Sequence, residues 1–281
     1  MLNRPRKNIL VSLGLLLALD HRATAAAFIN LARQKNQPLT LSQITAFMPR
    51  ILEVDGLVKV GSIGVMEFRK KISNILNLSV SDDEFDAAWN AMLGDPKKLY
   101  TQLTRIKAQN PTINYVLFSK TNPIHMAFIF KHCHPEKVLG PQEHNPLHLL
   151  AMPLYVSYQS ASCLASSVEA AFCDEILLSE QMVSEETSIV VLQQSYSPFD
   201  VIKERDDNSI NNTRDWALSR GIGIINVKPK QDVAFILQPA IPMHDYGLKN
   251  VSGKTLMWSH ATPADPETTQ TLAVRATCVR H

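Results

Sequence analysis

Two serines lie within or directly after strongly apolar segments, where a polar side chain can meet a ligand. Ser12 lies inside the apolar run 9–19, and Ser119 follows the apolar segment 113–118. In an open parallel sheet, ligands bind at the carboxyl ends of the strands. The Ser119 hydroxyl can contact an anion there or serve as an ordinary turn residue. The simplest interpretation of Ser12 is a small polar residue at a strand end.

Asp20 supplies a carboxylate just after the first apolar run. The segment Asp20-His21-Arg22-Ala23-Thr24 imitates an Asp-x-Asp-x-Thr pattern with a nucleophilic first aspartate, although Arg22 replaces the second acid. Aspartate is also common at helix N-caps, and a helix is expected to begin near Ala23. The sequence favours the cap and keeps Asp20 as a rival nucleophile.

Histidines gather in one part of the chain, and imidazole is a frequent metal ligand. The group consists of His125, His132, Cys133, His134, His144 and His148. Its spacing matches no familiar ligand pattern, so we expect no metal site and interpret the stretch as irregular and solvated. The four cysteines contain no CxxC pair, which argues against a disulfide framework or a cysteine-rich zinc module.

Apolar segments separated by helical or irregular stretches predict a doubly wound parallel sheet in an α/β fold. The expected strands are 9–19, 113–118, 175–178, 201–202 and 222–227. The irregular interval 135–170 and the tail 228–281 are expected to decorate this core.

The region between the first two strands has a helical period. In the segment 84–94, apolar residues recur at the spacing of one helix face. Similar stripes predict helices around Val65–Ile75 and Leu99–Ile106. A shorter helix around Ile44–Met48 is expected to end or kink at Pro49.

Two of the strand-end segments carry a family resemblance. The run Ile9-Leu10-Val11-Ser12-Leu13-Gly14-Leu15-Leu16 resembles the first motif of the haloacid-dehalogenase-like (HAD-like) hydrolases, an apolar strand entering Asp-Leu-Gly-Gly-Val-Leu. Ser12 stands where the aspartate belongs, and Gly14 matches a motif glycine. The run Val116-Leu117-Phe118-Ser119-Lys120-Thr121-Asn122-Pro123-Ile124-His125 is similar to the second motif, a strand ending in Ser-Asn-Thr-Asn before a histidine. Only Lys120 departs there.

The later motifs match less well. Residues 174–181 are similar to the approach to the third motif, but Val183-Ser184-Glu185-Glu186-Thr187 replaces Gly-x-Arg-Lys-Pro and puts Glu186 at the lysine position. The acidic pair of the fourth motif is represented at best by Asp206-Asp207 or Asp207-Asn208. The resemblance covers about residues 8–228.

The resemblance implies a Rossmannoid core of residues 1–19 and 100–228, a helical cap of residues 20–99, and a C-terminal extension of residues 229–281. The family's hydrolases attack with the first-motif aspartate, and its phosphatases hold magnesium on that carboxylate and on later acids. A serine hydroxyl needs a base to become a nucleophile and is a poor ligand for a hard cation. The expectation is therefore a catalytically inactive binding or interaction module without a cofactor. The alternative is a divergent magnesium-dependent hydrolase that uses Asp20 or Asp207.

Charge and the N-terminal segment limit the partners and the location. The formal net charge is +2, without the clustered basic residues that bind nucleic acid. We therefore expect no nucleic-acid partner, while the sequence identifies neither a ligand nor a protein partner. The run 9–19 is too short to span a bilayer. We expect a cytoplasmic protein. The alternative is export after cleavage near Ala25, since Arg4, Arg6 and Lys7 precede the apolar run as in a signal peptide.

Overall fold

The computed structural model describes residues 8–17, 19–109, 111–133, 152–160, 168–182, 187–192 and 199–227. The strands are β1 (Asn8–Ser12), β2 (Asn114–Ser119), β3 (Leu154–Val156), β4 (Thr187–Leu192) and β5 (Gly223–Val227). The helices are α1 (Leu13–Leu17), α2 (His21–Gln34), α3 (Leu41–Lys59), α4 (Val65–Leu76), α5 (Asp82–Asn90), α6 (Pro96–Gln109), α7 (Pro123–His132), α8 (Val168–Ser179) and α9 (Asp200–Ser219), and a 3-10 turn spans Ser157–Gln159.

The five strands form one parallel sheet in the order β3-β2-β1-β4-β5. β1 is central and pairs with β2 on one side and with β4 on the other. The predicted parallel α/β fold is therefore confirmed. Cleavage near Ala25 would remove this central strand and α1 with it.

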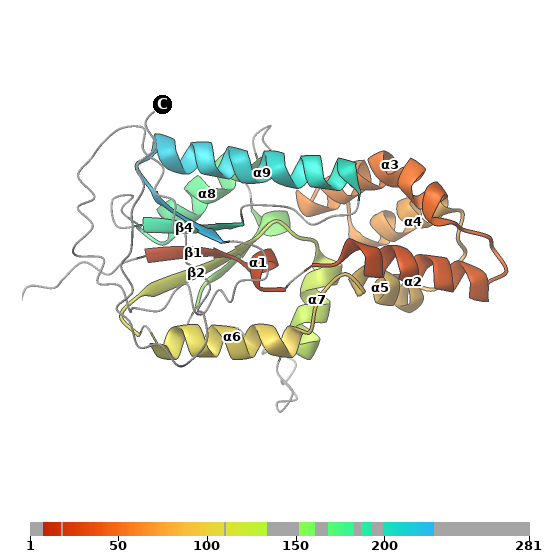
Figure 1. Ribbon diagram of the computed structural model, residues 1–281, viewed down its shortest axis with the longest axis horizontal. Coiled ribbons are helices and arrows are strands. Elements are labelled where there is room, and N and C mark those ends of the chain that lie inside the picture. The colour runs from red at the N-terminus through yellow and green to blue at the C-terminus, as the bar shows by residue number, and fades with distance from the viewer. Residues whose placement is uncertain are drawn as a thin grey trace, which may run out of the picture.

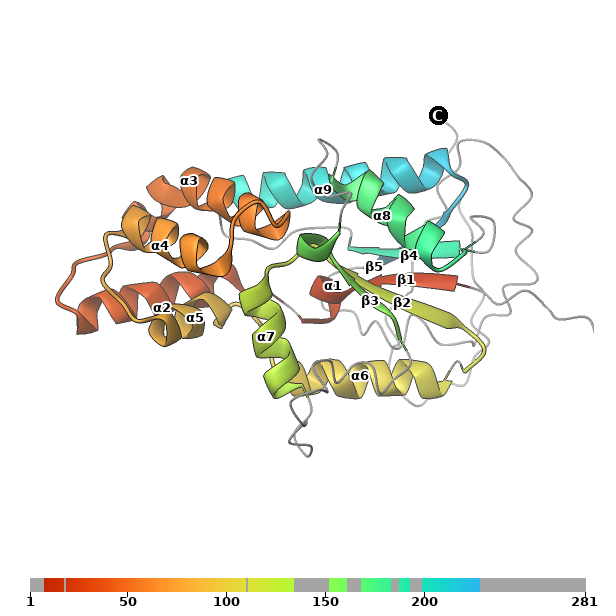
Figure 2. The same ribbon diagram turned by 180° about the vertical axis from the view of Figure 1, so that it is seen from behind.

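Helices cover both faces of the sheet (Figures 1 and 2). Because side chains alternate along a strand, Ile9 and Val11 of β1 belong to the cluster that includes Leu103 of α6, whereas Leu10 belongs to the opposite cluster with Ile176 of α8 and Trp216 of α9. All three β1 side chains are at most 2% exposed. Burial on both faces explains why β1 is apolar throughout.

Helices α2 to α5 form a separate group beside the sheet, as Figure 1 shows. They share their own hydrophobic cluster, to which the sheet region adds Ile124 of α7 and Phe199 and Ile202 at the start of α9. Four aromatic rings lie at its centre, namely Phe28, Phe68, Phe85 and Trp89, with neighbouring centroids 5.1–6.4 Å apart. The chain thus has the helical cap expected between the first two strands.

Several predicted elements have the right place, and others are wrong. β2, β5 and helices α4, α5 and α6 match the expected segments. The expected strand 9–19 ends at Ser12, where α1 begins. Residues 175–178 lie in α8, and Val201-Ile202 lies in α9. An apolar run that is buried in a helix has the same composition as an inner strand, so composition alone could not separate them.

Two strands and one helix length also differ from the expectation. β3 lies inside the interval 135–170 that was expected to be irregular, and β4 follows the expected third motif. α3 continues through Pro49 to Lys59, so the proline does not end the helix. α6 crosses the expected boundary between residues 99 and 100 and packs on the sheet. Residues 228–281 lie outside the described part of the chain. No described helix is long and apolar enough to span a membrane.

Gly61 lies between α3 and α4, close to the backbone of Tyr158, in a conformation that an alanine tolerates poorly. Its φ is +73°, and an added Cβ would lie 2.9 Å from the backbone oxygen of Tyr158. We expect Gly61→Ala to lower the free energy of unfolding by about 1–3 kcal/mol, measured by urea denaturation. Gly56→Ala is the matched control. It lies within α3 with no atom near the added Cβ, so it should raise stability by about 0.5–1 kcal/mol. Equal effects at both sites would contradict this account of Gly61.

Candidate functional site at the cap and the sheet edge

The carboxyl ends of β1 and β2 bring Ser12 and Ser119 to the same edge of the sheet. Ser12 is the last residue of β1 and pairs in register with Phe118, one residue before Ser119. Ser12 is half-buried, and Ser119 is buried. Gly14 follows in α1, and a Cβ added there would lie 3.9 Å from Ser12 Oγ. The structure therefore places the first and second motif positions on adjacent strands, as the resemblance implies.

The residues after β2 are held by buried hydrogen bonds. Asn122 caps α7, because its Oδ1 accepts a hydrogen bond of 3.0 Å from His125 N. The backbone N–H of Thr121 donates to Ser157 Oγ at 3.2 Å, and the Ser157 hydroxyl donates to Lys59 O at 2.6 Å. Ser157 thus joins the ends of β2 and β3 to the last turn of α3, which belongs to the cap.

Asp20 occupies the helix cap rather than a buried reaction site. It is exposed and precedes α2, and its Oδ1 accepts a hydrogen bond of 2.9 Å from Arg22 N. The expected capping role is confirmed, with the helix beginning at His21 instead of near Ala23. A carboxylate in this position satisfies an otherwise orphan N–H at the helix start.

Of the positions assigned to the later motifs, the structure places the fourth-motif pair in a helix. Asp207 and Asn208 lie within α9, well beyond its first turn, and Asn208 is exposed. The segment Val201-Ile202, which was expected to be a strand, forms part of the first turn of that helix. The strand that precedes α9 is β4, which ends at Leu192. Glu186 lies outside the described residues.

Only some members of the histidine group lie within the described residues. His125 is buried in α7, whereas His132 is exposed. Cys133 is buried, and desolvation raises the pKa of its thiol to about 11. The remaining members, His134, His144 and His148, lie outside the described residues. Among the described residues, no group of three or more His, Cys, Asp or Glu side chains could hold a metal ion.

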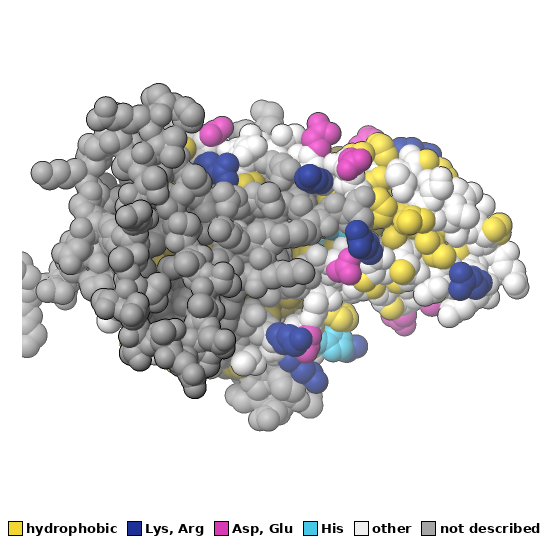
Figure 3. Space-filling view, viewed as in Figure 1, with side chains coloured by type: hydrophobic (Ala, Val, Ile, Leu, Met, Phe, Trp, Pro, Cys, Tyr) yellow, Lys and Arg dark blue, Asp and Glu magenta, His cyan; other side chains and the backbone are white. Residues whose placement is uncertain are grey.

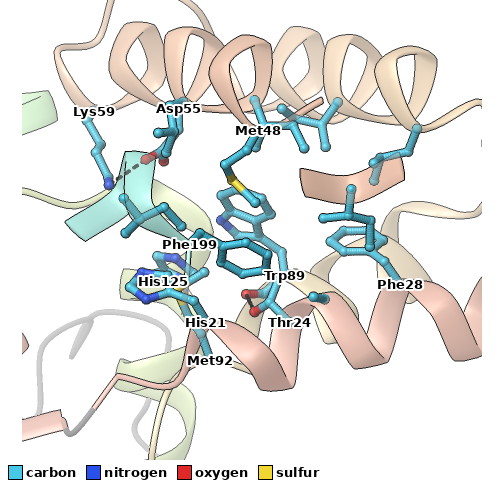
Figure 4. Close-up of a pocket in the computed structure, with 17 residues that line it drawn as sticks. His21, Thr24, Phe28, Met48, Asp55, Lys59, Trp89, Met92, His125 and Phe199 are labelled. Carbon is cyan, nitrogen blue, oxygen red and sulfur yellow. Dashed lines mark hydrogen bonds and ion pairs between the residues drawn. The ribbon is translucent and has the colours of Figure 1, made fainter. Parts of the chain in front are cut away.

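Sequence reasoning missed a cavity in the cap, next to the sheet region. Its volume is about 60 Å³, and its walls come mainly from α2 and α3, with contributions from α4, α5, α7 and α9. Figure 4 labels ten of its lining residues: His21, Thr24, Phe28, Met48, Asp55, Lys59, Trp89, Met92, His125 and Phe199. In the space-filling view, hydrophobic side chains gather over the cap, with charges of both signs scattered around them (Figure 3).

Two charged side chains from α3 face each other in this cavity. Lys59 Nζ lies 2.6 Å from Asp55 Oδ2, and the side chains are 16% and 6% exposed. A carboxylate on the buried face of an apolar helix is the sequence signal that could have revealed the site. Asp55 lies one turn beyond Ile51 and three residues before Val58, both buried.

His125 forms part of the same wall and is held in the neutral state. Burial, followed by the nearby charge of Lys59, lowers the pKa of His125 to about 3. Its Nδ1 lies 2.8 Å from Asn90 Oδ1, so this nitrogen carries the proton, because an amide oxygen only accepts. The imidazole stacks on Trp89 at 5.9 Å between centroids and 11° between planes.

No family model matches this sequence, and no curated protein matches it either. Solved structures do resemble this chain in their fold. A HAD family enzyme of Bacteroides thetaiotaomicron has 21% sequence identity and a TM-score of 0.59, with 84% of this chain and 100% of that chain covered. An aspartate-to-alanine variant of that enzyme, in complex with magnesium and inorganic phosphate, has 22% identity and a TM-score of 0.55 over 83% of this chain and 99% of that chain.

A predicted HAD-like family hydrolase of Porphyromonas gingivalis is a further neighbour. It has 15% identity and a TM-score of 0.55, and the match covers 80% of this chain and 93% of that chain. At these identities the comparison concerns the fold. The chain therefore has the HAD-like fold, a parallel α/β core with a helical cap inserted after the first strand.

Proposed function

We propose that this protein binds a small ligand through its HAD-like scaffold and performs no aspartyl phosphoryl transfer. The observation that carries the proposal is Ser12, a hydroxyl at the carboxyl end of the central strand, where the family resemblance calls for the attacking carboxylate. Fold alone does not decide between an enzyme and a binding protein, so the argument depends on the chemistry of this edge.

A serine at this position lacks the help that it would need to attack phosphorus. A hydroxyl becomes a nucleophile only when a neighbouring group accepts its proton. Within the described residues, no basic side chain is hydrogen-bonded to Ser12. His125 is the buried imidazole of the region, and it is engaged with Asn90 and Trp89.

Magnesium does not fit the groups described at this edge. A hard cation of this type takes carboxylate and other oxygen ligands in near-octahedral geometry. The described side chains there include the hydroxyls of Ser12, Ser119, Thr121 and Ser157, the ammonium of Lys120, and the amide of Asn122, whose oxygen caps α7. Asp20 is engaged as a helix cap, and Asp207 lies in α9. The proposal therefore involves no magnesium step.

Hydrolysis of a generic ester tests the proposal. Purified full-length protein is incubated with para-nitrophenyl phosphate and magnesium, beside the variants Asp20→Asn and Asp207→Asn. We expect phosphate release by the wild type to equal that of both variants. Magnesium-dependent turnover that either substitution removes would reject the binding role and establish the divergent hydrolase that uses that aspartate.

A further inference from the structure

We propose that the cap cavity binds a small, neutral, mostly apolar molecule whose carbonyl-type oxygen accepts a hydrogen bond from the indole N–H of Trp89. The inference rests on the proposed binding function and names its ligand class. Three features of the cavity support it: its size, one buried donor, and the balance of charge on its walls.

The size of the cavity suits a compact organic molecule. A single water needs roughly 10–15 Å³ of such volume, so 60 Å³ corresponds to roughly four waters. The walls offer few partners to so many waters, because they are largely aromatic and aliphatic, with Phe28, Met48, Ile72 and Phe199 among them. A small apolar ring of about four carbon atoms fills this space without losing hydrogen bonds.

Trp89 supplies a donor that the cap itself leaves unused. Its side chain is 5% exposed, and no described residue accepts a hydrogen bond from Nε1. An indole N–H can only donate, so a partner must offer an acceptor oxygen or nitrogen. Figure 4 shows the indole among the lining residues, with its nitrogen on the side of Met48 and Asp55. Contacts with Phe68, Phe85 and His125 hold the ring in this orientation.

The charges on the walls favour a neutral ligand. Lys59 and Asp55 neutralise each other at 2.6 Å, and His125 is uncharged because burial disfavours its protonated form. An ionised ligand would have to lose its hydration without gaining a counter-ion. His21 and Thr24 also line the cavity. The hydroxyl of Thr24 is already engaged, because it donates a hydrogen bond of 3.3 Å to the backbone oxygen of Trp89.

A pair of probes that differ in one heavy atom tests the hydrogen bond. Cyclobutanone carries a carbonyl oxygen, and methylenecyclobutane has a CH₂ group in its place. Both are titrated into full-length protein labelled with ¹⁵N, and the indole N–H signals of the three tryptophans are followed. We expect a saturable downfield shift of the Trp89 signal with cyclobutanone. In Trp89→Phe, the affinity for cyclobutanone relative to methylenecyclobutane should fall about tenfold, as for the loss of one buried hydrogen bond.

Two variants keep this test decisive. Trp216→Phe is the matched control, because Trp216 lies in another hydrophobic cluster and its Nε1 already donates to Asp174 at 3.0 Å. It should leave the affinity ratio unchanged. Ala25→Leu places extra carbons in the cavity and should abolish binding of both probes even if Trp89→Phe does not fold. The absence of a saturable shift in the wild type would overturn the inference, as would binding by Ala25→Leu or an unchanged ratio in Trp89→Phe.

The failure of this inference can be told apart from the failure of the proposed function. Phosphate release is measured without reference to Trp89, and probe binding is measured without a phosphate ester. Turnover with normal probe binding would reject the non-catalytic role alone. A lack of probe binding without turnover would reject the ligand class alone.

Discussion

Replacement of Lys59 by methionine is expected to lower the free energy of unfolding by about 3 kcal/mol at pH 7. The change removes the ammonium group 2.6 Å from Asp55, whose side chain is only 6% exposed. The Asp55 carboxylate then keeps its desolvation penalty but loses its ion pair with Lys59. Urea denaturation monitored by circular dichroism measures the effect.

An exposed pair with the same spacing is the matched control for Lys59. Glu67 and Lys71 of α4 are also four residues apart, at 3.4 Å, and their side chains are 54% and 44% exposed. Lys71→Met should change stability by no more than about 0.5 kcal/mol, because exposed pairs are screened by water. A Lys59→Met effect as small as that of Lys71→Met would show that the buried pair contributes little.

Acidification should destabilise the protein through His125. The pKa of His125 is about 3 in the folded chain, below its ordinary value of 6.5, so the unfolded state binds more protons between these values. The stabilising contribution is fully present above pH 6.5 and is lost as the pH falls toward 3. The slope reaches about 1.4 kcal/mol per pH unit only well below pH 6.5, where the unfolded imidazole is fully protonated, so the loss between pH 6.5 and 4.5 is about 2 kcal/mol. Urea denaturation at a series of pH values measures this loss.

Glutamine substitutions isolate the contribution of His125. His125→Gln removes the titrating group while keeping hydrogen-bonding atoms, and the variant should lose that part of the pH dependence. His132→Gln, at an exposed position of the same helix, should follow the wild-type profile. If His125→Gln and the wild type lose stability in parallel between pH 6.5 and 4.5, the imidazole is not held neutral by burial.

The parts of the fold that could be predicted from the sequence are those with a strong periodic signal. The apolar stripe over 84–94 made the buried face of α5 readable, and the structure begins this helix at Asp82 with a capping box of Ser81 and Glu84. β2 was readable because a polar segment ends its apolar run. Residues 175–178 lacked this contrast, since an apolar helix on the sheet and a buried strand share one composition.

The short strand β3 was not predicted from the sequence, for a different reason. β3 has only three residues, and its place in the sheet depends on pairing with β2. Such pairing is a long-range interaction that no local pattern reports. The continuation of α3 through Pro49 also depends on tertiary contacts, because the packing of α3 on α2 and α4 outweighs the local cost of the proline.

The candidate site was predicted in part. The sequence placed Ser119 at a strand end and Ser12 at the first-motif position within the expected strand 9–19. The structure ends β1 at Ser12, and the parallel register brings both serines to one edge. The cavity could not be predicted in the same way, because its walls come from helices far apart along the chain. Asp55 was the local clue, as a carboxylate within the apolar stripe of α3. In the sequence, Trp89 belongs to the apolar face of the helix expected over 84–94. Only the tertiary structure shows that its indole N–H has no described partner.

A direct measurement of the central claim is the formation of a fluoroberyllate adduct, which mimics an aspartyl phosphate on an attacking carboxylate. Fluorine NMR follows full-length protein with magnesium, beryllium and fluoride, beside an active aspartate-dependent phosphatase as the positive sample. With Ser12 at the end of β1, we predict no protein-bound fluoroberyllate signal from this chain. A magnesium-dependent signal that disappears in Asp20→Asn or Asp207→Asn would contradict the account, because it would reveal an attacking carboxylate.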